Sequence, residues 1–167
     1  MATTYEKIAT TTLTSTAATI TLSSIPATYT DLVAVVNIGA DVAGNMQIRL
    51  NGDTGANYST LTLIAYNSTV TGSGYYTGMT FMYAAVAGAL PLTVGPASAV
   101  MQFNNYSNST TYKTMLARYA AASVPEVDAT VCTWRNTAAI TSINLSSYSS
   151  SVYLVGTTFT LYGIKAA

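Results

Sequence analysis

Few side chains in this sequence of 167 residues could do chemistry. It has six Asp and Glu residues, a single cysteine and no histidine. Without histidine, the chain lacks the commonest general base, the Ser–His nucleophile pair and every His-based metal site. Cys132 alternates with Trp134 in an extended pattern and has no histidine to activate its thiol. We therefore expect Cys132 to be a buried structural thiol.

Glu126 and Asp128 form the acidic pair that comes nearest to a catalytic spacing. Because they are two positions apart, their side chains would share one face of an extended strand. A glycosidase needs two carboxylates that face each other across a cleft, whereas neighbours on one strand are typical of its solvated start. We expect a solvated start and keep catalysis as the alternative. No glycine-rich phosphate-binding loop is present. The sequence thus predicts no catalytic residue, no metal site, no cofactor and no enzyme activity.

The segment "NGDTGANYS" is the densest polar stretch of the chain. Asn51, Asp53 and Asn57 could supply oxygens to a calcium ion, although only Asp53 carries a charge. Asn51 and Gly52 follow an alternating strand and tolerate the positive φ of a tight turn. Asp53 and Asn57 can then accept or donate hydrogen bonds near the turn. We expect a structural turn, with a loop that contacts a neighbouring subunit and a metal site as alternatives.

The elements that must position these residues are strands, because apolar and polar residues alternate in many short segments. Asn, Gly and Ser separate these segments at spacings of roughly ten residues, which is typical of an antiparallel sandwich. One segment, "DLVAVVNI", is apolar on both faces and suits a strand that is buried on both sides. We expect an all-β fold, an antiparallel two-sheet sandwich that is jelly-roll-like, in a single domain over residues 1–167. Clear examples of alternation are "TITLS", "NMQIRLN", "TYKTMLARY" and "ATVCTWR".

The composition points to contacts with protein. Charged residues make up 7% of the chain, against about 25% in an ordinary soluble domain. The net charge is zero, so nothing attracts nucleic acid or an acidic membrane surface. No apolar run is long enough to span a membrane, and no signal peptide is apparent. A surface so poor in charge favours association with protein.

Residues 75–96 break the alternation and form the best candidate for a contact surface, a possible interface insertion. The stretch is rich in aromatic residues and methionine and poor in charge, as the centres of interfaces are. We expect a core strand followed by a buried connection and keep a surface that packs on another subunit as the alternative. The candidate interface residues are Tyr75, Tyr76, Met79, Phe81, Met82 and Tyr83.

Residues 1–12 are expected to form an N-terminal arm or an edge strand. The segment reads as a strand with no earlier element to pair with, which suits addition to the sheet edge of another chain. Its candidate contact residues are Tyr5, Lys7 and Ile8.

In five segments the chain resembles small structural proteins of tailed bacteriophages, including cyanophages. The segments are "YEKIATTTLTSTAATITLSSIPATYTDLVAVVNI", "IRLNGDTGANYS", "NNYSNSTTYKTMLARY", "WRNTAAITSINL" and "GTTFTLYGIKA". Each alone is a simple β sequence, and their order carries the resemblance over most of the chain. Residues 75–96 match least well.

The resemblance implies a virion protein without catalytic residues, most simply a capsid decoration (cement) protein. Such a protein binds the outside of the phage head as a homotrimer and ties subunits of the major capsid protein together. The alternative is a tail-fibre, tail-tip or other adhesive module that binds host surface glycan. Its support is the tyrosine content and Trp134, since aromatic rings stack on sugars, although the position of Trp134 beside Cys132 in a strand favours the core.

Overall fold

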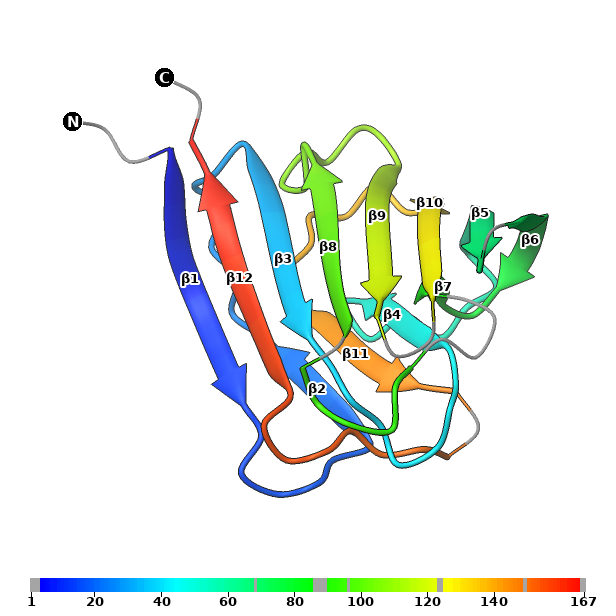
Figure 1. The fold of residues 1–167 in the computed structure, drawn as a ribbon. Coiled ribbons are helices and arrows are strands. Elements are labelled where there is room, and N and C mark those ends of the chain that lie inside the picture. The colour runs from blue at the N-terminus through cyan, green and yellow to red at the C-terminus, as the bar shows by residue number, and fades with distance from the viewer. Residues whose placement is uncertain are drawn as a thin grey trace.

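The computed structural model describes residues 4–67, 69–85, 90–95, 97–122, 125–148 and 150–165, the side chains of 71–73 excepted. These residues form two antiparallel sheets that pack face to face (Figure 1). The predicted two-sheet sandwich is therefore confirmed. No helix in this part of the chain is long and apolar enough to cross a lipid bilayer.

Within the described residues, the larger sheet has eight strands in the spatial order β1-β12-β3-β8-β9-β10-β5-β6. They are β1 (Tyr5–Thr12), β12 (Thr158–Ile164), β3 (Asp31–Asn37), β8 (Ala97–Asn104), β9 (Lys113–Ala121), β10 (Glu126–Trp134), β5 (Tyr58–Tyr66) and β6 (Thr69–Met79). The smaller sheet has the order β2-β11-β4-β7. Its strands are β2 (Thr19–Leu22), β11 (Ile143–Ser147), β4 (Met46–Leu50) and β7 (Met82–Ala85).

The strand order is that of a jelly roll with two hairpins added. In a jelly roll, strands lettered B to I in chain order form the sheets B-I-D-G and C-H-E-F. When the β5–β6 and β9–β10 hairpins are set aside, β1-β12-β3-β8 follows the first order and β2-β11-β4-β7 the second. We call β1, β12, β3 and β8 the jelly-roll half of the larger sheet. We call β9, β10, β5 and β6, which continue that sheet beyond β8, the extension.

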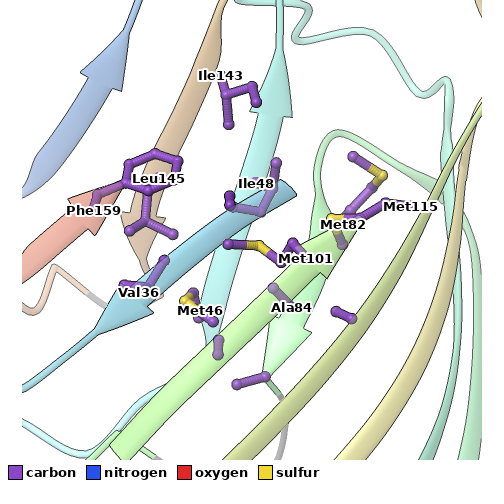
Figure 2. Close-up of a cluster of buried hydrophobic side chains, with 14 of the residues drawn as sticks. Val36, Met46, Ile48, Met82, Ala84, Met101, Met115, Ile143, Leu145 and Phe159 are labelled. Carbon is purple, nitrogen blue, oxygen red and sulfur yellow. The ribbon is translucent and has the colours of Figure 1, made fainter. Parts of the chain in front are cut away.

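The core lies between the two sheets (Figure 2), where Met46 and Ile48 of β4 and Met82 of β7 lie among Met101 of β8 and Phe159 of β12. All five side chains are fully buried. Strands such as β9 show strict alternation of buried and exposed positions, because one face of the sheet meets this core. Methionine is flexible and fills irregular gaps between two twisted sheets. The β7 strand also contacts β9, β10 and β5, so the smaller sheet anchors the extension as well.

Candidate functional site

The predicted tight turn is present between β4 and β5. Asn51 and Gly52 have φ angles of 53° and 66°, in the left-handed region that these residue types adopt most readily. The Asn51 side-chain oxygen accepts hydrogen bonds from the backbone N–H groups of Thr141 at 2.8 Å and Ser142 at 3.1 Å. Its amide donates to the carbonyl of Ala139 at 2.7 Å. The side chain therefore ties this turn to the connection that leads into β11.

Asp53 is occupied by donors from its own chain. One carboxylate oxygen accepts from the Gly55 backbone N–H at 2.7 Å. The other accepts from the Trp134 indole at 2.7 Å and from the Asn57 amide at 2.9 Å. The indole, followed by the amide and the backbone N–H, lowers the pKa of Asp53 although burial opposes the shift. The loop geometry is thus that of a structural turn, and a contact with a neighbouring subunit stays a prediction.

No metal centre is apparent in the described part of the chain, where no three His, Cys, Asp or Glu side chains gather into a possible ligand set.

Trp134 is in the core, as its position in the strand predicts. It is 1% exposed and its ring stacks on Tyr58 at 6.3 Å between centroids, with 13° between the planes. The Tyr58 hydroxyl donates to the carbonyl of Asp53 at 3.0 Å. Burial raises the pKa of Tyr58 to about 12, so its hydroxyl stays a donor at any physiological pH. The buried indole is not available to stack on a sugar.

Cys132 is a buried thiol, which confirms the expectation. Its sulfur lies 3.3 Å from the Thr60 hydroxyl and donates to the carbonyl of Tyr83 at 3.3 Å. Burial raises the pKa of the thiol to about 12, and the bonds to Thr60 and Tyr83 offset part of that shift. The thiolate that nucleophilic chemistry requires is therefore suppressed.

Glu126 and Asp128 correct a prediction, because they do not mark a solvated start of a strand. Glu126 is 3% exposed and Asp128 is fully buried, on the side of β10 that also carries Trp134. Burial, and then the neighbouring carboxyl of Asp128, raises the pKa of Glu126 to about 7. Burial and the two acids also raise the pKa of the Tyr119 hydroxyl. The carboxyls sit side by side on one strand, so the arrangement is not two groups facing each other across a cleft.

The candidate interface residues of 75–96 divide between surface and core. Tyr75 is 68% exposed, whereas Met82 is fully buried and Tyr83 is 8% exposed. Met82 and Tyr83 are buried in β7, as expected of a core strand, so their candidate role as contact residues is wrong. Phe81 and Tyr76 are partly buried and make edge-on contacts with Tyr83, with ring centroids 5.0 Å and 5.3 Å away. Met79 packs against the core. Residues 86–89 and 96 lie outside the described residues.

The N-terminal segment is an edge strand that pairs within its own chain. Tyr5 lies opposite Ile164 and Lys7 opposite Tyr162 of β12, and the register shifts between Lys7 and Ala9. Ile8, in that irregularity, packs against the core. The strand therefore has a partner that the sequence did not indicate. Addition of its free edge to another chain stays a prediction, and residues 1–3 lie outside the described residues.

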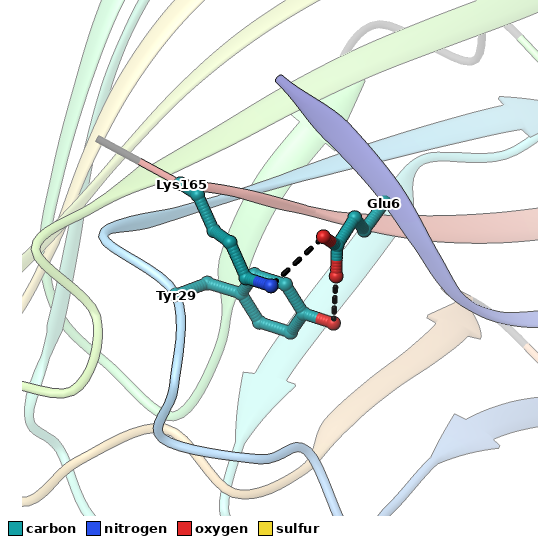
Figure 3. A network of polar contacts seen from close by, with 3 residues as sticks. All are labelled: Glu6, Tyr29 and Lys165. Atoms are coloured by element: carbon teal, nitrogen blue, oxygen red, sulfur yellow. Dashed lines mark hydrogen bonds and ion pairs between the residues drawn. The ribbon is translucent and has the colours of Figure 1, made fainter. Parts of the chain in front are cut away.

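A polar network fastens this edge (Figure 3). The Glu6 carboxylate accepts a hydrogen bond from the Tyr29 hydroxyl at 3.1 Å and forms an ion pair with the Lys165 ammonium at 2.8 Å. The Tyr29 ring lies where a side chain on Gly163 would have to be, so glycine at that position lets the ring pack against β12. The network joins both ends of the described chain to the loop before β3.

The candidate site is the outer face of the extension. It is assembled from neighbouring strands, so the pattern of any single strand does not reveal it. We call its outward side chains the extension face. Leu116 of β9, Val131 of β10, Leu61 of β5 and Tyr75 of β6 follow one another in cross-strand register. The large apolar members are 42–68% exposed: Leu61, Leu63, Val70, Tyr75, Leu116, Val127 and Val131. Apolar patches of this kind mark sites of contact with protein or ligand.

A shallow hollow of about 400 Å³ is sunk into this face and its border with β8. Ala129 lies in register with Arg118 on one side and Leu63 on the other. Because its side chain is a single methyl group, it leaves room that the larger neighbours do not fill. The hollow is lined by Val100, Gln102, Leu116, Ala117, Arg118, Ala129, Thr130 and Val131.

Comparison with known proteins adds no family. No protein-family model matches the chain, and no curated protein matches it. Among solved structures, an aerolysin-like protein of Bombina maxima aligns with 86% of this chain and 93% of its own, at 7% sequence identity and a TM-score of 0.13. A score that low carries no argument about fold or function.

Proposed function

We propose that this protein is a non-enzymatic structural protein of a phage virion, a capsid decoration (cement) protein that binds other virion subunits through the extension face. The observation that carries the binding role is the row of exposed apolar side chains from Leu116 to Tyr75 across the extension. A lone protein gains nothing from such a row, whereas a partner that covers it removes apolar surface from water. The virion setting is supported by the sequence resemblance.

The proposed mechanism is mechanical. The protein attaches to the outside of the phage head, where it contacts the major capsid protein, and it assembles with itself, as a homotrimer. Each contact is small, but many copies on one shell act together, so modest affinities add up. The described chemistry is compatible with this role, since Cys132 and Glu126, whose pKa values are raised, are buried in the sandwich. No cofactor enters the proposal.

The test is to locate the protein in purified virions. Mass spectrometry of separated heads and tails, with image reconstruction of virions that carry a tagged copy, should place it on the head surface. A variant with Leu61, Leu63 and Leu116 replaced by Thr should fold and fail to occupy heads. Heads that retain no copies, or label found only at the tail, would contradict the proposal.

The glycan-binding alternative has lost its main support. Trp134 is in the core, so sugar stacking would fall to exposed tyrosines such as Tyr75 or Tyr112, which are 68% and 58% exposed. Tyr75 is on β6 and Tyr112 is in the loop before β9, and no described contact joins the two rings. Specific binding of the isolated protein on a glycan array would restore this alternative.

A further inference from the structure

On β5 and β10, several apolar side chains of the extension face outward although acids and threonines are buried on the inward side, beside Tyr58 and Trp134. On β10, Val127 and Val131 face out, whereas Glu126 and Asp128 face in. On β5, Leu61 and Leu63 face out while the inward Thr60 and Thr62 are buried. A strand that was only the cover of its own core would show the reverse pattern. The outward apolar residues therefore indicate a second, external contact.

Arg118 indicates that the partner in this contact carries a negative charge. It lies among the outward side chains, in register with Val100 on β8 and Ala129 on β10. In the described part of the chain no carboxylate lies within ion-pair distance of it. Arg135, at the end of β10, already donates to the Ser59 hydroxyl and to the carbonyl of Ala56. The apolar row thus carries a guanidinium without an acidic partner, beside a hollow.

The chain's own carboxylates are used elsewhere, which argues against a second copy as the occupant. Glu6 is paired with Lys165, Asp53 accepts from Trp134, and Glu126 and Asp128 are buried inward. Asp31 and Asp41 accept backbone hydrogen bonds as well. Two extension faces packed against each other would also bring two guanidinium groups together without a counter-charge, which is unfavourable.

The size of the face suits a segment of chain. From strand spacing and rise, β8 to β6 offer roughly 20 Å across the strands and about 30 Å along them, on the order of 600 Å². That is less than the roughly 800 Å² that each partner contributes to a standard interface. A short extended segment covers such an area, whereas a globular partner needs more contact to bind stably.

We infer that the extension face binds a protein segment that places an aliphatic side chain in the hollow over Ala129 and a carboxylate on Arg118. The apolar side chain removes Leu116 and Val131 from water, and the carboxylate pairs with the guanidinium in a geometry that allows two hydrogen bonds. This inference rests on the proposed function in one respect, that the face meets protein. It adds the chemistry of the partner.

The test uses the full chain and a library of short random peptides displayed on yeast. Selection on the wild type should enrich peptides in which Asp or Glu is next to Val, Leu or Ile. The Arg118→Gln variant should bind the enriched peptides roughly tenfold more weakly, with no remaining preference for acids. Ala129→Phe, which fills the hollow, should abolish binding. Matched controls on the jelly-roll half, Lys7→Gln and Thr160→Phe, should bind as the wild type does.

Four results would overturn the inference. They are no enrichment, enrichment without acids, equal binding by Arg118→Gln, and sedimentation of the wild type as an oligomer that Leu116→Asp dissociates. The last would assign the face to a second copy. Absence of the protein from heads would instead defeat the proposed function while leaving a positive peptide result intact, so the two failures are distinguishable. Circular dichroism of each variant shows whether it is folded.

Discussion

The outward side of the larger sheet differs between its two halves, the jelly-roll half and the extension. On the jelly-roll half, Thr10 donates to Thr160 at 3.2 Å, and the Asn37 amide contacts the Thr158 hydroxyl at 3.5 Å. On the extension, a different row of outward positions carries leucine, valine and tyrosine, namely Leu116, Val131, Leu61 and Tyr75. Threonine and valine have the same branched shape and both favour strands, so strand formation does not require the change. The difference concerns what each half meets.

The two halves also treat apolar residues differently. Val33 faces outward on the jelly-roll half, between Tyr162 and Gln102 in register, and is only 5% exposed. On the extension, Leu63 and Val131 are 52% and 48% exposed. Neighbouring side chains of the same chain cover Val33, whereas Leu63 and Val131 stay exposed to solvent. This indicates that the outward apolar side chains of the extension contribute little to the isolated fold.

The largest expected effect tests whether the two halves fold as one unit. Trp134→Ala removes the side chain that anchors β10, and we expect a loss of about 3 to 5 kcal/mol in the free energy of unfolding, because a large cavity remains. Thermal unfolding followed by circular dichroism should show a single transition at a lower temperature. Thr133→Ala, on the opposite side of the strand, is the control. Two transitions, one at the wild-type temperature, would show that the extension is a separate unit.

The inward acids of the extension should make stability depend on pH. The pKa of Glu126 is raised from 4.5 to about 7 in the folded chain. Stability from this group is therefore fully present below pH 4.5 and is lost as the pH rises through 7, by up to roughly 3 kcal/mol. Urea unfolding at pH 5 and pH 8 should show the loss, and Glu126→Gln should remove it.

Asp41→Asn is the control for that experiment, because hydrogen bonds lower the pKa of Asp41 and its contribution is lost in acid. It should keep the loss of stability between pH 5 and pH 8. An unchanged pH dependence in Glu126→Gln would mean that another group titrates.

The link between the extension and the β4–β5 turn should be weaker than the core. Asp53→Ala leaves the Trp134 indole without its acceptor, and we expect a loss of about 1 to 3 kcal/mol. Denaturant unfolding measures it, with the exposed Thr54→Ala as control. If Asp53→Ala were as stable as the wild type, water would be serving the indole equally well.

The smallest effect on stability is expected on the extension face, and it bears most directly on the contrast between the halves. Leu61, Leu63 and Leu116 replaced by Thr should each change the free energy of unfolding by about 0.5 kcal/mol or less. Binding of a fluorescent dye that reports exposed apolar surface should fall. Thr10→Leu with Thr160→Leu should raise it. A large loss of stability in any of the three leucine-to-threonine variants would mean that the extension face supports the fold.

Local chemistry made part of this structure predictable. The Asn51-Gly52 turn follows from the preference of both residues for positive φ, and the burial of Cys132 and Trp134 follows from alternation in one strand. The sandwich follows from many such strands. The jelly-roll order and the position of the added hairpins depend on pairings between distant strands, such as β10 with β5, which no local pattern encodes.

The side of β10 that faces inward was not predictable from hydrophobicity alone. One side carries Glu126 and Asp128 with Trp134, and the other carries Val127 and Val131. The valine side looks like the core side, but the tryptophan packs inward and fixes the parity of the whole strand. Met82 was wrongly chosen as a candidate contact residue for a related reason, because a core strand and the centre of an interface have similar apolar compositions.

The pairing of the first strand with the last has a mechanical consequence. Tyr5 and Ile164 are partners at the end of the larger sheet where both chain ends leave it (Figure 1). Because the hydrogen bonds of an antiparallel pair run across the strands, tension between the two chain ends would open them one after another, from Tyr5 toward Thr12. A pull on one end alone, along β1, would load all of them together. An attachment through a single chain end would therefore resist force better than one through both.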